Sequence, residues 1–85
     1  MGKTSVESLR SYIKYSQTQI ERYEKDYSRA RHIIASEKEM HKKYGGHEAA
    51  IRNWTNIAES AKRNIEKEKE NIKNLREQIR KLNGE

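Results

Sequence analysis

The sequence predicts an all-α protein, namely an antiparallel two-helix hairpin of the coiled-coil type that self-associates into a four-helix bundle. Apolar positions recur with a 3-4 spacing through both halves of the chain, and the only strong interruption is Gly45-Gly46. Such spacing lines up apolar side chains along one side of an α-helix. We therefore expect a single domain over residues 1–85, with helices at 5–44 and 48–83 joined by a turn at 45–47.

The first helix is expected to begin at a capping box formed by Thr4 and Glu7. In this motif the hydroxyl accepts a hydrogen bond from an early backbone N–H, and the carboxylate reaches back to the N–H of the cap residue. From there the 3-4 spacing continues without a phase slip up to the glycine pair. The seam positions of the first helix are Val6, Leu9, Ile13, Ser16, Ile20, Tyr23, Tyr27, Ala30, Ile34, Glu37, His41 and Tyr44.

The glycine pair marks the reversal of the chain. Glycine costs about 1 kcal/mol inside a helix and readily takes the left-handed conformation of a C-cap. A second helix then follows and closes at Asn83-Gly84. Its seam positions, again at 3-4 spacing, are Ile51, Trp54, Ala58, Ala61, Ile65, Glu68, Ile72, Leu75, Ile79 and Leu82.

The register decides which seam residues of an antiparallel pair face one another. The register we favour keeps the glycines in the turn and sets large residues against small ones in several layers. It pairs Ile13 with Leu82, Ile20 with Leu75, Tyr23 with Ile72, Ala30 with Ile65, Ile34 with Ala61 and Tyr44 with Ile51. It also places Tyr27 opposite Glu68, whose carboxylate could accept a hydrogen bond from the phenol. The alternative register pairs Tyr27 with Ala61 and lengthens the loop.

The composition limits how stable this hairpin can be alone. The chain has 85 residues, 32% of them hydrophobic and 38% charged, and no cysteine. A chain of this size buries only a little over ~60% of the surface exposed by its unfolded form, and small domains without disulfides usually oligomerise. No apolar run approaches the length of a membrane span, and the N-terminus lacks a signal-peptide core. We expect a cytoplasmic protein, of bacterial or phage type, without a membrane span.

The apolar surface is wider than a two-stranded seam requires. Tyr12, Ile33 and Met40 flank the seam of the first helix at g positions of the heptad, and Ile57 does so in the second. A stripe widened in this way suits a helix with several neighbours. We expect a homodimer, or a helical protein partner, to cover this surface near the turn. The expected interface residues are Tyr12, Ile33, Met40, Trp54 and Ile57. The function that this predicts is that of a small adaptor, inhibitor or assembly protein.

A nucleic-acid-binding bundle is the alternative function. The formal net charge is +6, and basic residues form a stripe on each helix. Such stripes could follow the phosphates of RNA or DNA. Acidic residues are interspersed along the same helices, however, which is typical of a solvated face laced with i,i+3 and i,i+4 ion pairs. The residues expected to carry this alternative are Arg22, Arg29, Lys62 and Lys69.

Catalysis, cofactors and small-molecule substrates are not expected. Acid–base or nucleophilic catalysis needs a concave and partly dry site, which a two-helix rod does not offer. Glu37, His41, His47 and Glu48 gather near the turn and could offer metal ligands. A histidine at a helix C-terminus is also favoured by the helix dipole alone, and a nearby carboxylate can reach water. We therefore expect no metal site and no enzyme.

Overall fold

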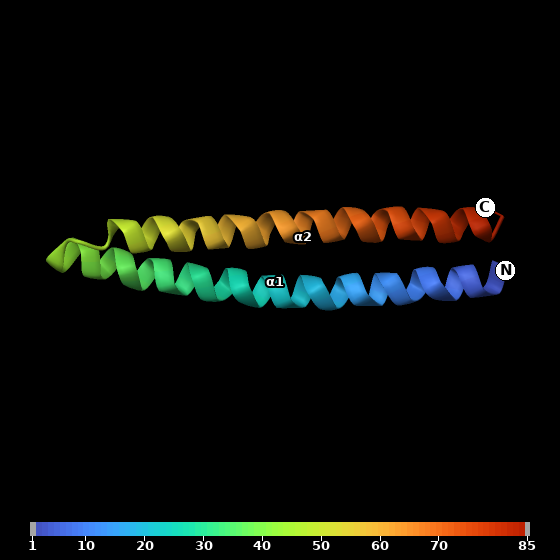
Figure 1. Cartoon of the computed structure of the whole chain (residues 1–85), viewed down its shortest axis with the longest axis horizontal. Coiled ribbons are helices and arrows are strands. Elements are labelled where there is room, and N and C mark those ends of the chain that lie inside the picture. Colours follow the sequence, from blue (N-terminus) through green and yellow to red (C-terminus); the bar gives the residue numbers. More distant parts are fainter. Residues whose placement is uncertain (1, 85) are drawn as a thin grey trace.

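The computed structural model describes the backbone of residues 2–84 and the side chains of residues 6–84. Over this range the chain forms two helices, α1 (Gly2–Tyr44) and α2 (Glu48–Leu82), which pack against each other in antiparallel orientation (Figure 1). The rod measures 63 × 15 × 14 Å, with the turn at one end and both termini at the other (Figure 1). The predicted all-α helical hairpin is confirmed.

α1 is 43 residues long because no glycine or proline interrupts the chain between Lys3 and Tyr44. It starts at Gly2, ahead of the start expected at residue 5. The capping box expected at Thr4 and Glu7 depends on the Thr4 side chain, which lies outside the described residues. The last turn of α1 contains His41, Lys42 and Lys43. Positive charge there interacts favourably with the negative end of the helix dipole.

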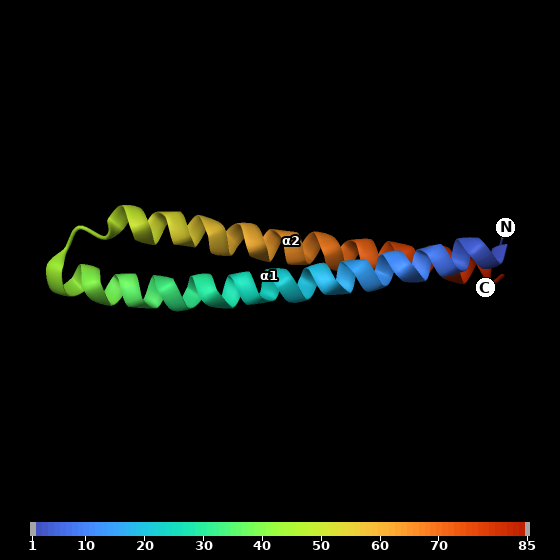
Figure 2. The same cartoon turned by 60° about the horizontal axis from the view of Figure 1, so that its bottom comes forward.

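The turn is made by two glycines in left-handed conformations, with φ of +70° at Gly45 and +82° at Gly46. Residues with a Cβ adopt this region only at a cost. The Gly45 N–H donates to the His41 carbonyl at 2.8 Å and closes the last turn of α1. The chain then runs back alongside α1 before α2 begins at Glu48, so the end of α1 projects beyond the start of α2 (Figures 1 and 2).

Small residues form the most buried part of the seam. Ala30 is 0% exposed and Ala58 is 4% exposed, and together with Ile34 they make the core cluster, against which Tyr27 and Trp54 pack. Nearer the termini the buried seam residues are Ser16 on α1 and Ala61, Ile72 and Leu75 on α2. Because alanine and serine bring little apolar area, the hairpin hides only a narrow core.

The register expected from the sequence is wrong, and the alternative register is the one observed. Ala30 packs with Ala58 instead of Ile65, and Ile34 belongs to the same cluster. The Asn71 side-chain amide donates to the Ser16 hydroxyl at 3.0 Å, a contact that only the alternative register permits. The pairing of Tyr27 with Ala61 belongs to this same register, one heptad away from the register we favoured.

The turn explains the shift. The favoured register assumes that α2 begins directly opposite the end of α1, whereas the chain first runs back along the last turn of α1. All the pairs expected in that register are therefore absent, and two of them show the difference directly. Tyr44 is 77% exposed on the projecting end of α1 and does not face Ile51 from within the seam. Tyr27 packs on the core cluster rather than meeting Glu68.

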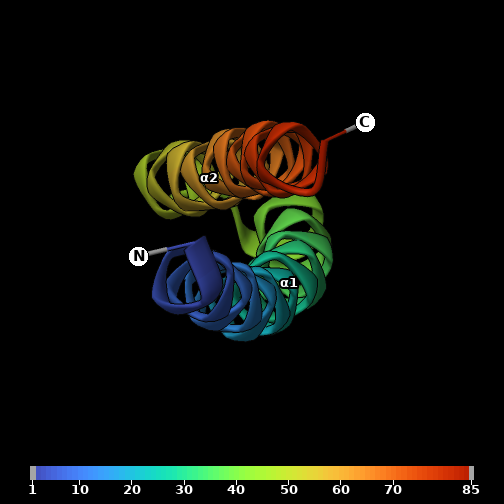
Figure 3. The same cartoon turned by 90° about the vertical axis from the view of Figure 1, so that its right-hand side faces the viewer.

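The two helices cross and curve around each other when viewed along the rod (Figure 3). A heptad repeat imposes this behaviour, because an apolar period of 3.5 residues drifts around a straight α-helix of 3.6 residues per turn. Supercoiling keeps the seam closed along the rod. It also keeps the residues that flank the seam in register on two opposite faces.

Candidate functional site: two long faces and a polar turn

The seam separates two long faces of the hairpin. In an antiparallel pair with seam positions a and d, the g positions of both helices share one face and the e positions share the other. The g face consists of Tyr12, Gln19, Asp26, Ile33 and Met40 on α1 with Ala50, Ile57, Asn64, Asn71 and Gln78 on α2. The e face consists of Arg10, Gln17, Glu24, Arg31 and Lys38 on α1 with Glu48, Thr55, Lys62, Lys69 and Arg76 on α2.

The surface hollows of the rod lie on one face or the other. Asp26, Ile57 and Asn64 of the g face line one hollow, together with seam residues. Residues of the e face line two other hollows: Arg31, Lys38, Thr55 and Lys62 in the first, and Gln17, Lys69 and Arg76 in the second. Each of these three hollows is lined by seam residues and by side chains from one face only. The two faces are therefore separate surfaces.

The residues expected at a protein interface lie on or beside the g face. Tyr12 is 59% exposed, Met40 is 44% exposed and Ile57 is 38% exposed, whereas Ile33 is half-buried. They share one face because they occupy g positions, Tyr12, Ile33 and Met40 on α1 and Ile57 on α2. The face carries one charged residue, Asp26, at its g positions.

Trp54 occupies the border between the core and the g face. It packs on the cluster of Ala30, Ile34 and Ala58, and it also lines the g-face hollow with Ile57. The side chain remains half-buried. The single tryptophan of the chain is thus both a seam residue and part of the exposed surface.

The four residues expected to bind nucleic acid do not come together. Lys62 and Lys69 occupy e positions of α2 and line the two hollows of the e face. Arg29 lines the g-face hollow, and Arg22 lies one heptad before Arg29 on the same side of α1. The structure therefore places the two arginines on the other side of the rod from the two lysines.

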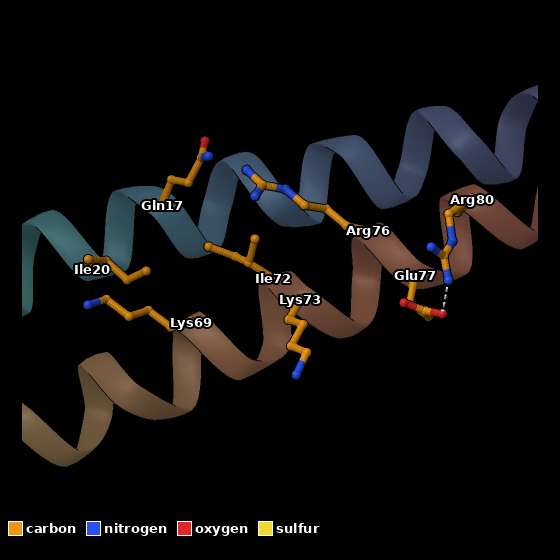
Figure 4. Close-up of a pocket in the computed structure, with 8 residues that line it drawn as sticks. All are labelled: Gln17, Ile20, Lys69, Ile72, Lys73, Arg76, Glu77 and Arg80. Carbon is orange, nitrogen blue, oxygen red and sulfur yellow. Dashed lines mark hydrogen bonds and ion pairs between the residues drawn. The ribbon is translucent and has the colours of Figure 1, made fainter.

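The hollow near the termini is an open groove of about 620 Å³ whose rim is basic. Figure 4 shows Gln17 and Ile20 from α1 on one side, and Lys69, Ile72, Lys73, Arg76, Glu77 and Arg80 from α2 on the other. Lys73 and Arg80 were not among the residues expected from the sequence. Their spacing from Lys69 and Arg76, by three or four residues, was the signal that could have found them.

The turn carries a cluster of polar contacts. The His47 backbone N–H donates to His41 Nδ1 at 3.1 Å, and His47 Nδ1 lies 2.5 Å from Glu37 Oε2. His41 Nε2 lies 3.7 Å from Glu48 Oε1. The contact to the His47 N–H requires an unprotonated Nδ1 on His41, so that imidazole serves as an acceptor for the turn. These contacts hold the loop against the end of α1.

Only the described side chains bear on metal binding. Within residues 2–84, no group of three or more histidine, cysteine or acidic side chains is arranged to hold a metal ion. The four side chains instead pair with one another or with the backbone of the turn. These contacts help to fix the geometry of the turn between α1 and α2.

The fold and the two faces define a helical-hairpin protein with a surface of distinct chemistry on each side of one seam. Neither α1 nor α2, over the described residues, has a stretch apolar enough to cross a lipid bilayer. Comparison of the chain with protein-family models, with curated proteins and with solved structures finds no match.

Proposed function

We propose that this chain is a non-enzymatic interaction module that binds a second copy of itself through the g face and so forms a four-helix bundle. The observation that carries the proposal is the exposure of Met40 and Ile57 near the turn, beside the half-buried Ile33 and Trp54, with Tyr12 exposed on the same face nearer the termini. Apolar side chains arranged in this way mark surfaces that a partner covers, whereas scattered single ones do not.

The exposed area of the hairpin supports association. The chain exposes 6836 Å², about 1,500 Å² more than the roughly 5,300 Å² typical of a folded monomer of this mass. A stable interface removes about 800 Å² from each partner. The g face runs the length of a 63 Å rod and offers an area of that order.

The charges favour a second copy as the occupant and the g face as the contact. Each chain carries a formal net charge of +6, so two copies repel each other unless their contact is nearly uncharged. Two e faces brought together would set Arg31, Lys62 and Lys69 against their own equivalents. The g faces can meet with Asp26 as the only charge at g positions, and each e face then points outward.

Such a bundle would act as an adaptor or assembly protein. A helical dimer with two outward-facing basic surfaces is a rigid spacer that can hold two acidic partners apart. In this proposal Tyr12, Ile33, Met40, Trp54 and Ile57 form the contact surface between copies. The e face stays free for a further partner.

The test is a pair of acidic substitutions on the g face, Ile33→Glu with Ile57→Glu. The wild-type protein should show about twice the 10.1 kDa chain mass in light scattering, and the variant should show the mass of one chain. The matched control is Ser11→Glu with Asn56→Glu, which adds the same charge at exposed positions on the outer sides of the helices. The control should remain associated.

Circular dichroism separates loss of association from loss of folding. If the double variant loses helicity, Met40→Glu gives a milder second variant, because that side chain is already 44% exposed. The proposal is wrong if a helical g-face variant stays fully associated, or if the wild-type chain is monomeric at every concentration measured.

A further inference from the structure

The groove near the termini differs from the rest of the surface in the number of cations on its rim. Lys69, Lys73, Arg76 and Arg80 follow one side of α2 at intervals of three or four residues. At 1.5 Å per residue they form a straight row about 16 Å long. In Figure 4 the Lys69 and Arg76 side chains lie between the two helices, whereas Lys73 points away from α1.

Most of this charge is not neutralised within the chain. Arg80 pairs with Glu77 at 2.5 Å. Lys69, Lys73 and Arg76 have no ion-pair partner among the residues whose side chains the structure describes. The floor between them is made of Ile20 and Ile72. Isoleucine cannot form an ion pair with a cation. The charges of Lys69, Lys73 and Arg76 can therefore interact with an external anion.

The basic rim continues toward the turn along the e face. The next hollow on that face is lined by Arg31, Lys38 and Lys62, with Glu59 as its acidic residue. Lys62 lies one heptad from Lys69 and Lys69 one heptad from Arg76, so the three share one side of α2. The cations therefore extend along the e face beyond one patch, with Glu24 of α1 and Glu59 of α2 beside them.

We propose that the e face binds the phosphate backbone of a double-stranded nucleic acid without reading its base sequence. A duplex presents phosphates at regular intervals along a stiff rod, and a straight row of lysine and arginine on a stiff helical rod matches that arrangement. Lysine and arginine are also the residues that make most sequence-independent phosphate contacts. The e face lies across the seam from the g face, so this binding does not depend on self-association.

The dimensions of the rod exclude base readout by insertion. The hairpin is 15 × 14 Å across, whereas the major groove of B-DNA is about 12 Å wide and admits one helix or a two-stranded ribbon. The e face presents both helices together, so it can only lie against the backbone from outside. The groove near the termini is also open to solvent and so does not enclose an extruded base.

The experiment measures binding of a fluorescent duplex of about 20 base pairs, long enough to span the 63 Å rod at 3.4 Å per base pair. The groove variant is Lys69→Gln with Arg76→Gln. The control is Lys25→Gln with Arg63→Gln, which removes the same charge from exposed positions on the outer sides of the helices. At low salt the groove variant should bind at least ten-fold more weakly than wild type, and the control should change by less than about two-fold.

Salt dependence gives a second readout. Loss of two phosphate contacts should flatten the slope of log affinity against log salt by about 2 in the groove variant and leave the slope of the control unchanged. The proposal is overturned if the wild-type protein does not bind the duplex at low salt, or if both variants weaken equally. It is also overturned if a single strand of the same length, or polyglutamate, binds as tightly as the duplex.

Discussion

The g face and the e face share one seam and one length, yet their chemistry is opposite. At its g positions the first carries tyrosine, methionine, isoleucine and amides with Asp26 as the one charge. At its e positions the second carries six cations, namely Arg10, Arg31, Lys38, Lys62, Lys69 and Arg76, with Glu24 and Glu48 as the acids. The seam therefore determines the fold, while the residues beside the seam determine what each side can bind.

The comparison also separates two ways in which the rod can bind a partner. Apolar side chains on the g face favour a closely packed helical neighbour, from which water is excluded. Exposed cations on the e face favour a solvated anionic partner, with an affinity that falls as salt is added. If the two faces act independently, a substitution on one face leaves binding at the other unchanged.

Overpacking the seam should disrupt both faces together. Ala30→Leu places a larger side chain at the most buried position, against Ala58 and Ile34. We expect the free energy of unfolding to fall by about 3 kcal/mol, at the upper end of the cost of an overpacked core. Urea denaturation followed by circular dichroism measures this. Ala35→Leu is the control, because Ala35 is exposed on the same helix, and a similar loss there would contradict the observed seam.

Truncating one g-face aromatic should weaken that face alone. Tyr12→Ala removes a 59% exposed side chain from the proposed contact surface. We expect self-association to weaken about ten-fold, or about 1.4 kcal/mol, with little change in duplex binding. Sedimentation equilibrium gives the association constant. Tyr44→Ala is the matched control, since Tyr44 projects beyond the turn and is 77% exposed. Equal effects of the two substitutions would remove the special role of the g face.

Removing the acceptor in the turn should affect the fold and leave the chemistry of both faces unchanged. His41→Ala deprives the His47 backbone N–H of its partner. We expect the free energy of unfolding to fall by about 1 kcal/mol, the usual value of one hydrogen bond. His32→Ala, at an exposed site on the same helix, should change it very little. Thermal or chemical denaturation measures the free energy of unfolding of the two variants. Equal values would show that the His41 contact does not stabilise the fold.

The smallest effect concerns the polar contact in the seam. Ser16 is 2% exposed and accepts a hydrogen bond from Asn71, an exposed residue of the g face. Ser16→Ala should change the free energy of unfolding by no more than about 0.5 kcal/mol, because the amide returns to water and alanine is the better helix former. Asn71→Ala should cost more, since it leaves the buried hydroxyl without this partner. The reverse order in denaturant melts would contradict the account.

The seam and the flanking faces could be predicted from the sequence because both depend on heptad spacing alone. The positions of Ala30, Ile34 and Ala58 on the seam follow from the 3-4 pattern, and so does the line of Tyr12, Ile33, Met40 and Ile57 beside it. A displacement of one heptad moves every cross-helix pair but keeps each residue on its own face. The faces are for this reason unaffected by the error in register.

The register could not be predicted, because the apolar pattern is nearly the same after a shift of one heptad. The turn decides between the two possibilities through the left-handed Gly45 and Gly46 and the contacts of His47 with Glu37 and His41. These contacts join residues through a loop whose path no periodicity encodes. Arg22 and Arg29 lie apart from Lys62 and Lys69 for a simpler reason. The two arginines occupy c positions of α1, which lie toward the g side of the helix.

The central claim is that a second copy covers the g face, and Trp54 reports on it directly. This single tryptophan is half-buried and lines the g-face hollow beside Ile57. Quenching of its fluorescence by acrylamide, followed across a dilution series, measures its access to solvent. We expect strong quenching in dilute solution and progressively weaker quenching as the chains associate. Quenching that stays the same at every concentration would contradict the central claim.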